Sequence, residues 1–152
     1  MDGLQGPMTY ERYLRITELI SLQNGQKSES ANGDELHFII VHQVFELWFK
    51  LLRSELGQVR DLFDSKNIEE ISVADAVRGL ERCTSLLNVM TQHWDLVGTL
   101  EPKGFLKFRH ELGSASGFES WQMRVVELIM GYRDETREDG SNPIQHLRNT
   151  AS

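Results

Sequence analysis

The chain has 152 residues, of which 39% are hydrophobic and 26% are charged, and its formal net charge is −7. These values are typical of a single globular domain and exclude a chain that is disordered throughout. The negative charge argues against nucleic acid or an anionic membrane as the main partner, because both bind positively charged surfaces. The single cysteine, Cys83, excludes an intrachain disulfide and an all-cysteine metal site.

The chain shows no sign of membrane insertion or secretion. No apolar run reaches the roughly 18 residues that a membrane-spanning helix needs. Residues 1–10 lack the charged and then apolar pattern of a secretory signal. We therefore expect a cytoplasmic protein.

The first half of the chain predicts two helices. Residues 9–22 form the first, because Thr9 is a suitable N-cap and apolar residues recur after it at helical spacing. Residues 23–33 are polar and predict a loop. Residues 34–63 predict a long helix that is apolar over more than half of its circumference, which is typical of a central, mostly buried helix. A largely aromatic stripe along it contains Phe38, His42, Phe45, Phe49, Leu52, Leu56 and Phe63.

The second half predicts two more helices. After a connection at residues 64–72, residues 73–100 predict a helix with an apolar face at heptad-like spacing. Residues 101–115 predict an irregular segment. Ser116 and Glu119 form a capping box, which predicts a fourth helix that ends near Gly131. The apolar face of the third helix contains Val77, Leu80, Leu87 and Trp94.

Together these patterns predict an all-α fold, an antiparallel bundle of about four main helices. Residues 1–132 form the single helical domain in this prediction. Residues 133–152 are polar and predict a C-terminal tail.

Four residues are candidates for ligand binding on their own chemistry. His42 lies at the edge of the aromatic stripe, where an imidazole can hydrogen-bond a flat apolar ligand; the alternative is a boundary histidine that pairs with Glu46. Arg109 lies among aromatic residues and can hold a carboxylate in a bidentate manner; the alternative is a surface arginine. Tyr10 and Tyr13 lie one turn apart, where their hydroxyls can join the polar end of a pocket or the rings can simply pack.

The sequence does not favour a metal site built from its own side chains. His37 and His42 lie about 140° apart around their helix and cannot share an ion. A carboxylate-bridged di-metal bundle needs two Glu-x-x-His motifs, and the nearest match is one Asp34-x-x-His37. Cys83 on a helix face is typical of a small core residue.

Three collinear segments resemble the tryptophan 2,3-dioxygenase family. The opening segment is YERYL at residues 10–14, followed by LISLQ at residues 19–23. The other two are DELHFIIVHQVFELWFK at residues 34–50 and FLKFRHELGSASGFESWQ at residues 105–122. The resemblance implies an all-helical protein that binds haem b. It also implies insertion of both atoms of O2 into the indole ring of L-tryptophan, which gives N-formylkynurenine.

The resemblance implies roles for individual residues. His42 would be the distal histidine that hydrogen-bonds the indole N–H, and Phe38 would pack on the indole. Arg109 and Tyr13 would hold the substrate carboxylate. Tyr10 matches a residue that the family lends to the pocket of a neighbouring subunit, which implies a homo-oligomer. The positions that match the lining of the haem and substrate cavity are Trp94, Phe105, Ser116 and Gly117.

The chain departs from the family pattern in composition and in extent. Phe105 stands where the family usually has tyrosine, and Trp121 replaces a smaller apolar residue, so the pocket is expected to suit tryptophan or a tryptophan derivative. The family's proximal, haem-ligating histidine lies beyond the matched segments, so the metal ligand is unknown. None of the remaining histidines stands at a matching position; these are His37, His93, His110 and His146.

The sequence leaves three functions open. The first is a haem-dependent oxygenase of the tryptophan 2,3-dioxygenase type. The second is a non-catalytic protein or subunit that binds tryptophan or another indole. The third is a helical scaffold that pairs with another chain through exposed apolar faces.

Overall fold

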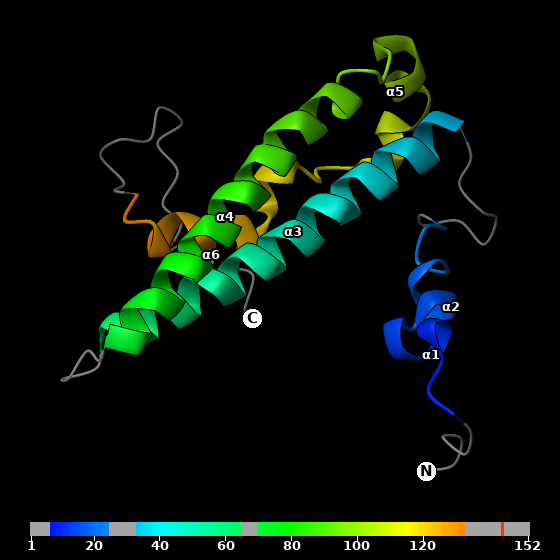
Figure 1. The fold of residues 1–152 in the computed structure, drawn as a ribbon. Helices are drawn as coiled ribbons and strands as arrows, with labels where there is room; N and C mark the ends of the chain where they lie inside the picture. The colour runs from blue at the N-terminus through cyan, green and yellow to red at the C-terminus, as the bar shows by residue number, and fades with distance from the viewer. Residues whose placement is uncertain (1–6, 25–32, 65–69, 133–143, 145–152) are drawn as a thin grey trace.

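The computed structural model describes residues 7–24, 33–64, 70–132 and 144 (Figure 1). Every regular element in these ranges is helical, which confirms the predicted all-α fold. None of the described helices is both long and apolar enough to span a membrane. The α-helices are α1 (Tyr10–Leu14), α2 (Ile16–Leu19), α3 (Gly33–Phe63), α4 (Glu70–Val97), α5 (Pro102–Phe108) and α6 (Trp121–Ile129). Two 3₁₀ turns, η1 (Arg109–Leu112) and η2 (Gly117–Glu119), connect α5 to α6.

Two long antiparallel helices, α3 and α4, form the spine of the molecule (Figure 1). Their bounds lie within three residues of the predicted helices. The core lies between them, and its centre is Leu52, which is 1% exposed. The predicted stripe on α3 supplies much of this core, because burial of its apolar side chains away from water drives the pairing. The core cluster contains Val41, Phe45, Leu52, Cys83, Leu86, Met90 and Val126.

The prediction for the buried face of α4 was wrong. Val77, Leu80, Leu87 and Trp94 are all exposed, whereas Ala76, Cys83, Leu86 and Met90 face α3. The two stripes lie side by side on a helix that is apolar over both faces. Small residues decide which stripe is buried. Gly79 shows this clearly, because a Cβ atom there would lie only 2.7 Å from the Val59 side chain.

The short helix α6 crosses α3 and completes the core. The Gln122 amide Nε2 donates to the Glu46 backbone oxygen and to its carboxylate Oε2, both at 2.9 Å. Ser120 caps α6 by accepting from the Met123 N–H. The helix ends as predicted at Gly131, whose φ of +76° lets the chain turn out of the helix. The fourth helix therefore begins at residue 121 rather than at 116, because the predicted capping box caps η2 instead.

Two other predicted segments differ from the structure. The first predicted helix is split into α1 and α2 by Arg15, which adopts a left-handed conformation with φ +51°. Neither helix buries a residue, so no packing holds them as one straight rod. The predicted irregular segment contains α5, which starts with Pro102 in its first turn. The predicted tail at residues 133–152 lies outside the described residues except for residue 144.

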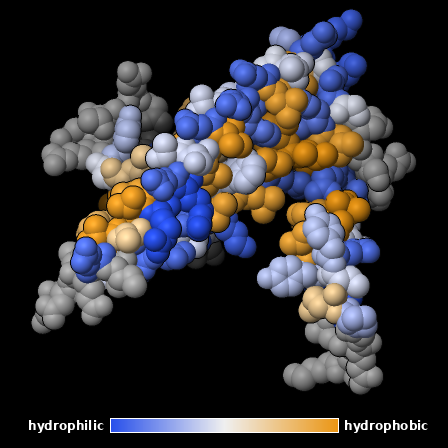
Figure 2. All heavy atoms as spheres, viewed as in Figure 1, coloured by the Kyte–Doolittle hydropathy of each residue, from blue (hydrophilic) through white to orange (hydrophobic). Residues whose placement is uncertain are grey.

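Much apolar surface remains exposed on the spine. Figure 2 shows hydrophobic side chains gathered along part of the paired α3 and α4 rather than scattered. On α3 the exposed apolar residues include Ile40, Leu47 and Leu51. Contiguous apolar surface on this scale is typical of a site that contacts other polypeptide.

Two glycines on the spine form a matched pair for a stability test. A Cβ at Gly57 would meet nothing within 4 Å, so Gly57→Ala should stabilise the fold by about 0.5–1 kcal/mol through helix propensity. Gly79→Ala makes the same local gain but forces α3 and α4 apart at Val59, so it should be destabilising by about 1 kcal/mol or more. Urea unfolding measures both changes. Equal stabilisation by the two substitutions would contradict the close helix contact.

The buried thiol of Cys83 should make stability fall at alkaline pH. Burial, and then the nearby Glu55 carboxylate, raise the pKa of Cys83. Because the folded pKa lies above the unfolded one, the protonated thiol contributes stability below the unfolded pKa. That contribution is lost as the pH rises through the folded pKa. We expect Cys83→Ala to remove this part of the pH dependence in urea unfolding at pH 7–10. Identical profiles for the two proteins would contradict the shift.

Candidate functional site

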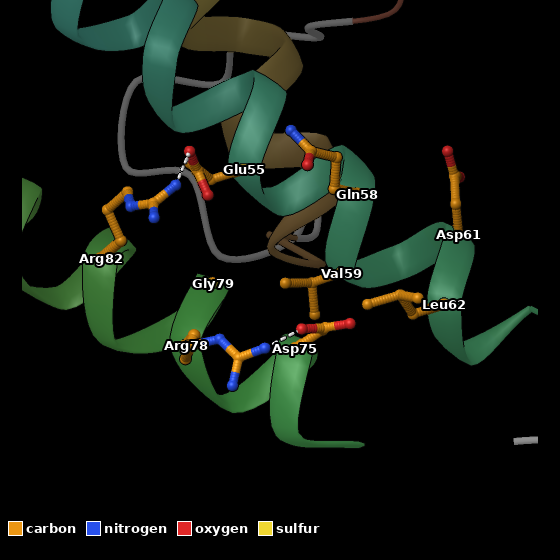
Figure 3. A pocket seen from close by; sticks show the side chains of 9 residues that line it. All are labelled: Glu55, Gln58, Val59, Asp61, Leu62, Asp75, Arg78, Gly79 and Arg82. Carbon is orange, nitrogen blue, oxygen red and sulfur yellow. Dashed lines mark hydrogen bonds and ion pairs between the residues drawn. The ribbon is translucent and has the colours of Figure 1, made fainter. Parts of the chain in front are cut away.

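The largest cavity lies between the C-terminal part of α3 and the N-terminal part of α4 (Figure 3). Its volume is about 510 Å³, and we call it the polar cavity. Arg82 reaches across it to the nearly buried Glu55, with 2.7 Å between Nη1 and Oε1, and Arg78 pairs with Asp75. The bond to Glu55 raises the pKa of Arg82. These charges neutralise one another, and no residue singled out from the sequence lines this cavity.

A second cavity of about 260 Å³, which we call the apolar cavity, lies where α3, α4, η2 and α6 meet. A neighbouring cavity of about 220 Å³ shares its His42 edge. Three of the residues predicted from the family resemblance, Trp94, Ser116 and Gly117, line the apolar cavity with His42, and Phe38 lines the smaller one. The apolar cavity is lined by His42, Phe45, Glu46, Phe49, Trp94, Val97, Ser116, Gly117, Phe118, Ser120 and Met123.

His42 is held in one orientation by its own helix. Its Nδ1 lies 2.7 Å from the Phe38 carbonyl oxygen, and the two rings pack with centroids 4.0 Å apart. A carbonyl can only accept, so Nδ1 carries the hydrogen and Nε2 of the neutral ring is an acceptor. Glu46, the partner in the alternative interpretation, instead accepts from Gln122. The geometry therefore gives the two cavities an oriented acceptor nitrogen at their shared edge.

A phenylalanine cluster fixes Phe38 from the other side. Phe38 contacts the rings of Phe105 and Phe108 on α5, with centroids 5.8 and 5.4 Å away. The helix α5 can approach α3 closely because Gly104 is buried where a Cβ would collide with the Asp34 carboxylate. Phe105 lies in this cluster and does not itself line a cavity. It supports the Phe38 and His42 pair from behind.

The loop before α6 forms the rim of the cavities. Ser116 Oγ accepts from the Phe118 N–H, and the Ser116 N–H donates to the Glu119 carboxylate at 3.2 Å. This capping box holds Ser116 and Gly117 at the edge of the apolar cavity. Phe118 and Met123 also line it, although nothing in their spacing had marked them.

Arg109 lies on η1 and is half-buried. Its Nη1 donates to the Gly113 carbonyl oxygen at 2.8 Å, which closes the turn that Gly113 makes with φ +57°. Leu112, in the same turn, lines the smaller cavity. Arg109 therefore stands one short turn from the site, with part of its guanidinium committed to the backbone.

Tyr10 and Tyr13 are not brought to the cavities by this chain. They lie on α1, 77% and 74% exposed, and α1 and α2 stand away from the spine in Figure 1. The segment is anchored to α3 at its end, where the Gln23 amide donates to the Gln43 side-chain oxygen at 2.7 Å. We call residues 7–24 the arm. It presents its tyrosines to the outside.

Trp121 lies outside the cavities. Its ring is covered by the Arg53 guanidinium, whose central carbon lies 4.5 Å from the ring centroid. This cation–π contact joins α6 to α3 on the outer surface. The expectation that Trp121 reshapes the pocket directly does not fit this position.

Two other histidines join the long helices reciprocally. His37 of α3 lies with Nε2 3.1 Å from the Leu96 carbonyl oxygen, and His93 of α4 lies with Nε2 3.2 Å from that of Val41. His110 is exposed on η1 beside Glu111. His146 lies outside the described residues. Among the described histidines only His42 lines a cavity, and these residues contain no cluster of three metal-ligating side chains.

Comparison with known proteins supports one family. The family model for tryptophan 2,3-dioxygenase matches residues 1–146. Tryptophan 2,3-dioxygenase 2 of Ralstonia nicotianae is 40% identical over 133 residues, which are 86% of this chain and 36% of the relative. The tryptophan 2,3-dioxygenase of Sorangium cellulosum is 37% identical over 86% of this chain and 32% of its own length. That of Caulobacter vibrioides is 39% identical over 85% of this chain and 46% of its own.

The chain thus spans about a third to just under half of the length of these relatives. The match covers the arm, the spine and the loop that forms the rim of the cavities. With a family model matched over residues 1–146, the chain belongs to the tryptophan 2,3-dioxygenase family.

Proposed function

We propose that this chain provides the substrate-recognition part of a haem-dependent tryptophan 2,3-dioxygenase site. The reaction is the insertion of both atoms of O2 into the indole ring of L-tryptophan or a tryptophan derivative, which gives an N-formylkynurenine-type product. The observation that carries this proposal is His42. Its Nδ1 is committed to the Phe38 carbonyl, and its Nε2 is left as an acceptor beside an apolar cavity.

The indole ring of tryptophan fits this arrangement. It is flat and apolar apart from one N–H donor, and the Nε2 of neutral His42 can accept that hydrogen. Phe38 lies against His42 and offers a ring for the indole to pack on. His42 therefore orients the substrate, and protonation of its ring would remove the acceptor.

The two ends of the amino acid need polar partners. Arg109 binds the substrate carboxylate in our proposal, using the guanidinium N–H groups that do not donate to Gly113. Tyr13 and Tyr10 act from the arm. Because the arm buries no residue of its own helices, we propose that it docks on a second copy and lends Tyr10 to that copy's pocket. The functional protein is then a homo-oligomer.

The described residues fit one face of haem b. Phe45, Phe49 and Trp94, with Val97 and Met123, form an apolar wall that suits a flat macrocycle. Haem, when bound, supplies the oxygen chemistry, and the protein orients the substrate. The described histidines other than His42 are tied to backbone carbonyls or lie on the surface. In our proposal the axial ligand therefore comes from polypeptide other than the described residues.

A non-catalytic protein or subunit that binds tryptophan is the second candidate. One specific observation favours it. The oriented acceptor of His42 and the apolar wall need no iron to hold an indole, and no described residue is placed as an axial ligand.

The absorption spectrum of the chain, expressed with haem supply, separates the two candidates. We expect a stoichiometric Soret band that shifts when L-tryptophan is added. His42→Ala should abolish the tryptophan-dependent shift while leaving haem content nearly unchanged, because His42 orients the substrate. Equal loss of both would contradict this role. The absence of a Soret band together with tryptophan binding in calorimetry would favour the binding protein.

Arg109→Lys should weaken L-tryptophan binding by roughly tenfold or more, because a point charge replaces a planar guanidinium. Indole, which lacks the carboxylate, is the matched control ligand, and its affinity should not change. Calorimetry measures both. A lysine variant that binds tryptophan as well as the parent chain would remove Arg109 from the site.

A further inference from the structure

The helix α4 carries a second apolar stripe on the side that does not face α3. Its members recur at alternating spacings of four and three residues, which is the spacing of a coiled-coil seam. All are exposed; Leu87 is the least exposed at 38% and Trp94 the most at 62%. We call this set the outer stripe, and it consists of Val73, Val77, Leu80, Thr84, Leu87, Thr91 and Trp94.

The two threonines of the outer stripe do not use their hydroxyls outward. Thr84 Oγ1 donates to the Leu80 carbonyl oxygen, and Thr91 Oγ1 donates to that of Leu87, both at 2.9 Å. Each hydroxyl is satisfied by its own helix, so it needs no water when the surface is covered. The whole stripe can therefore be buried without leaving an unpaired donor.

The spacing of the outer stripe identifies the shape of its partner. Side chains that alternate at three and four residues form one straight row along a helix, and a second helix packs along such a row by placing its knobs into the holes. A strand or an irregular loop does not match that repeat over the length from Val73 to Trp94. The partner is a helix that lies along α4.

Charge determines which helix fits. The positions that follow Val73, Leu80, Leu87 and Trp94 form the outer edge of the stripe, and they hold Ala74, Glu81, Asn88 and Asp95. This edge has two acids and no base. A second copy of α4 would bring acidic edges together in a chain of net charge −7. A partner with lysine or arginine along its edge is complementary.

Trp94 connects the outer stripe to the apolar cavity. Its ring lies 5.2 Å from that of Phe45, and the residue lines the cavity while more than half of it stays exposed. A helix on the outer stripe would cover Trp94 and close this side of the cavity. The longer relatives contain additional polypeptide that this chain does not match.

We propose that the outer stripe docks an amphipathic helix with a basic edge, from the segment that the longer relatives carry outside the matched region. Docking excludes water from Trp94 and completes the wall of the apolar cavity. It requires neither haem nor tryptophan. It can therefore succeed or fail independently of the proposed reaction.

Co-expression tests this proposal. The chain carries an affinity tag, and its partner is the part of the Ralstonia nicotianae relative outside its matched 133 residues. We expect the two polypeptides to purify as a 1:1 complex without added haem. Leu80→Glu with Leu87→Glu should abolish the complex. Ile40→Glu with Leu47→Glu, the matched control on the exposed stripe of α3, should leave it intact.

A second variant does not depend on burying a charge. Glu81→Lys with Asp95→Lys reverses the acidic edge at exposed positions, and it should weaken the complex by roughly tenfold. Circular dichroism and thermal unfolding confirm that each variant chain is folded. The proposal is overturned if no complex forms, if the complex survives the Leu80 and Leu87 changes, or if the edge reversal has no effect. A dimer of the chain alone that the Leu80 and Leu87 changes disrupt would also overturn it, since the occupant is then a second copy.

Discussion

The close pairing of α3 with α4 is the constraint on which the rest of the molecule depends. Packing side chains alone set its distance, since Gly79 admits Val59 where any larger residue would push the helices apart. Directed bonds set its register, because His37 and His93 each reach a backbone carbonyl on the opposite helix. Glu55 and Arg82 add a third tie further along. A helix pair fixed in both distance and register is a rigid frame on which shorter elements can be placed.

The site is a consequence of what α3 does on its other side. The same helix that buries Val41 against α4 turns Phe38 and His42 toward α5 and the loop before α6. The bond from His42 to the Phe38 carbonyl is local and needs no distant partner. The ring is therefore oriented before any ligand arrives, which lowers the entropic cost of binding. Glu46 serves the frame instead, because it anchors α6 through Gln122.

Sequence patterns predicted the elements well wherever a single apolar arc dominated. The helix α3 was predicted to within one residue at its start, since its arc is wide and continuous. The buried face of α4 was not predicted, because two apolar stripes lie side by side there and only packing against Val59 and its neighbours distinguishes them. The break at Arg15 has no pattern at all. It arises because nothing packs on the arm.

The site shows a similar division. His42 was a candidate from its place in the aromatic stripe, but the orientation of its ring depends on a backbone bond that spacing does not reveal. The roles of Ser116 and Gly117 came from family resemblance, and their place at the rim follows from a capping box that the sequence does show. Phe118 and Met123 could not be found, because an isolated apolar residue in a loop or at a helix start carries no periodicity.

The surplus of apolar surface is what links this fold to its proposed function. The exposed arm, the exposed stripe on α3 and the outer stripe of α4 would each cost free energy in water if they stayed uncovered. A fold of this kind reaches its lowest free energy only with other polypeptide packed on it. The apolar cavity lies beside one of these surfaces, at Trp94. Closure of the pocket and burial of the outer stripe are then a single event, so ligand binding and assembly should each strengthen the other.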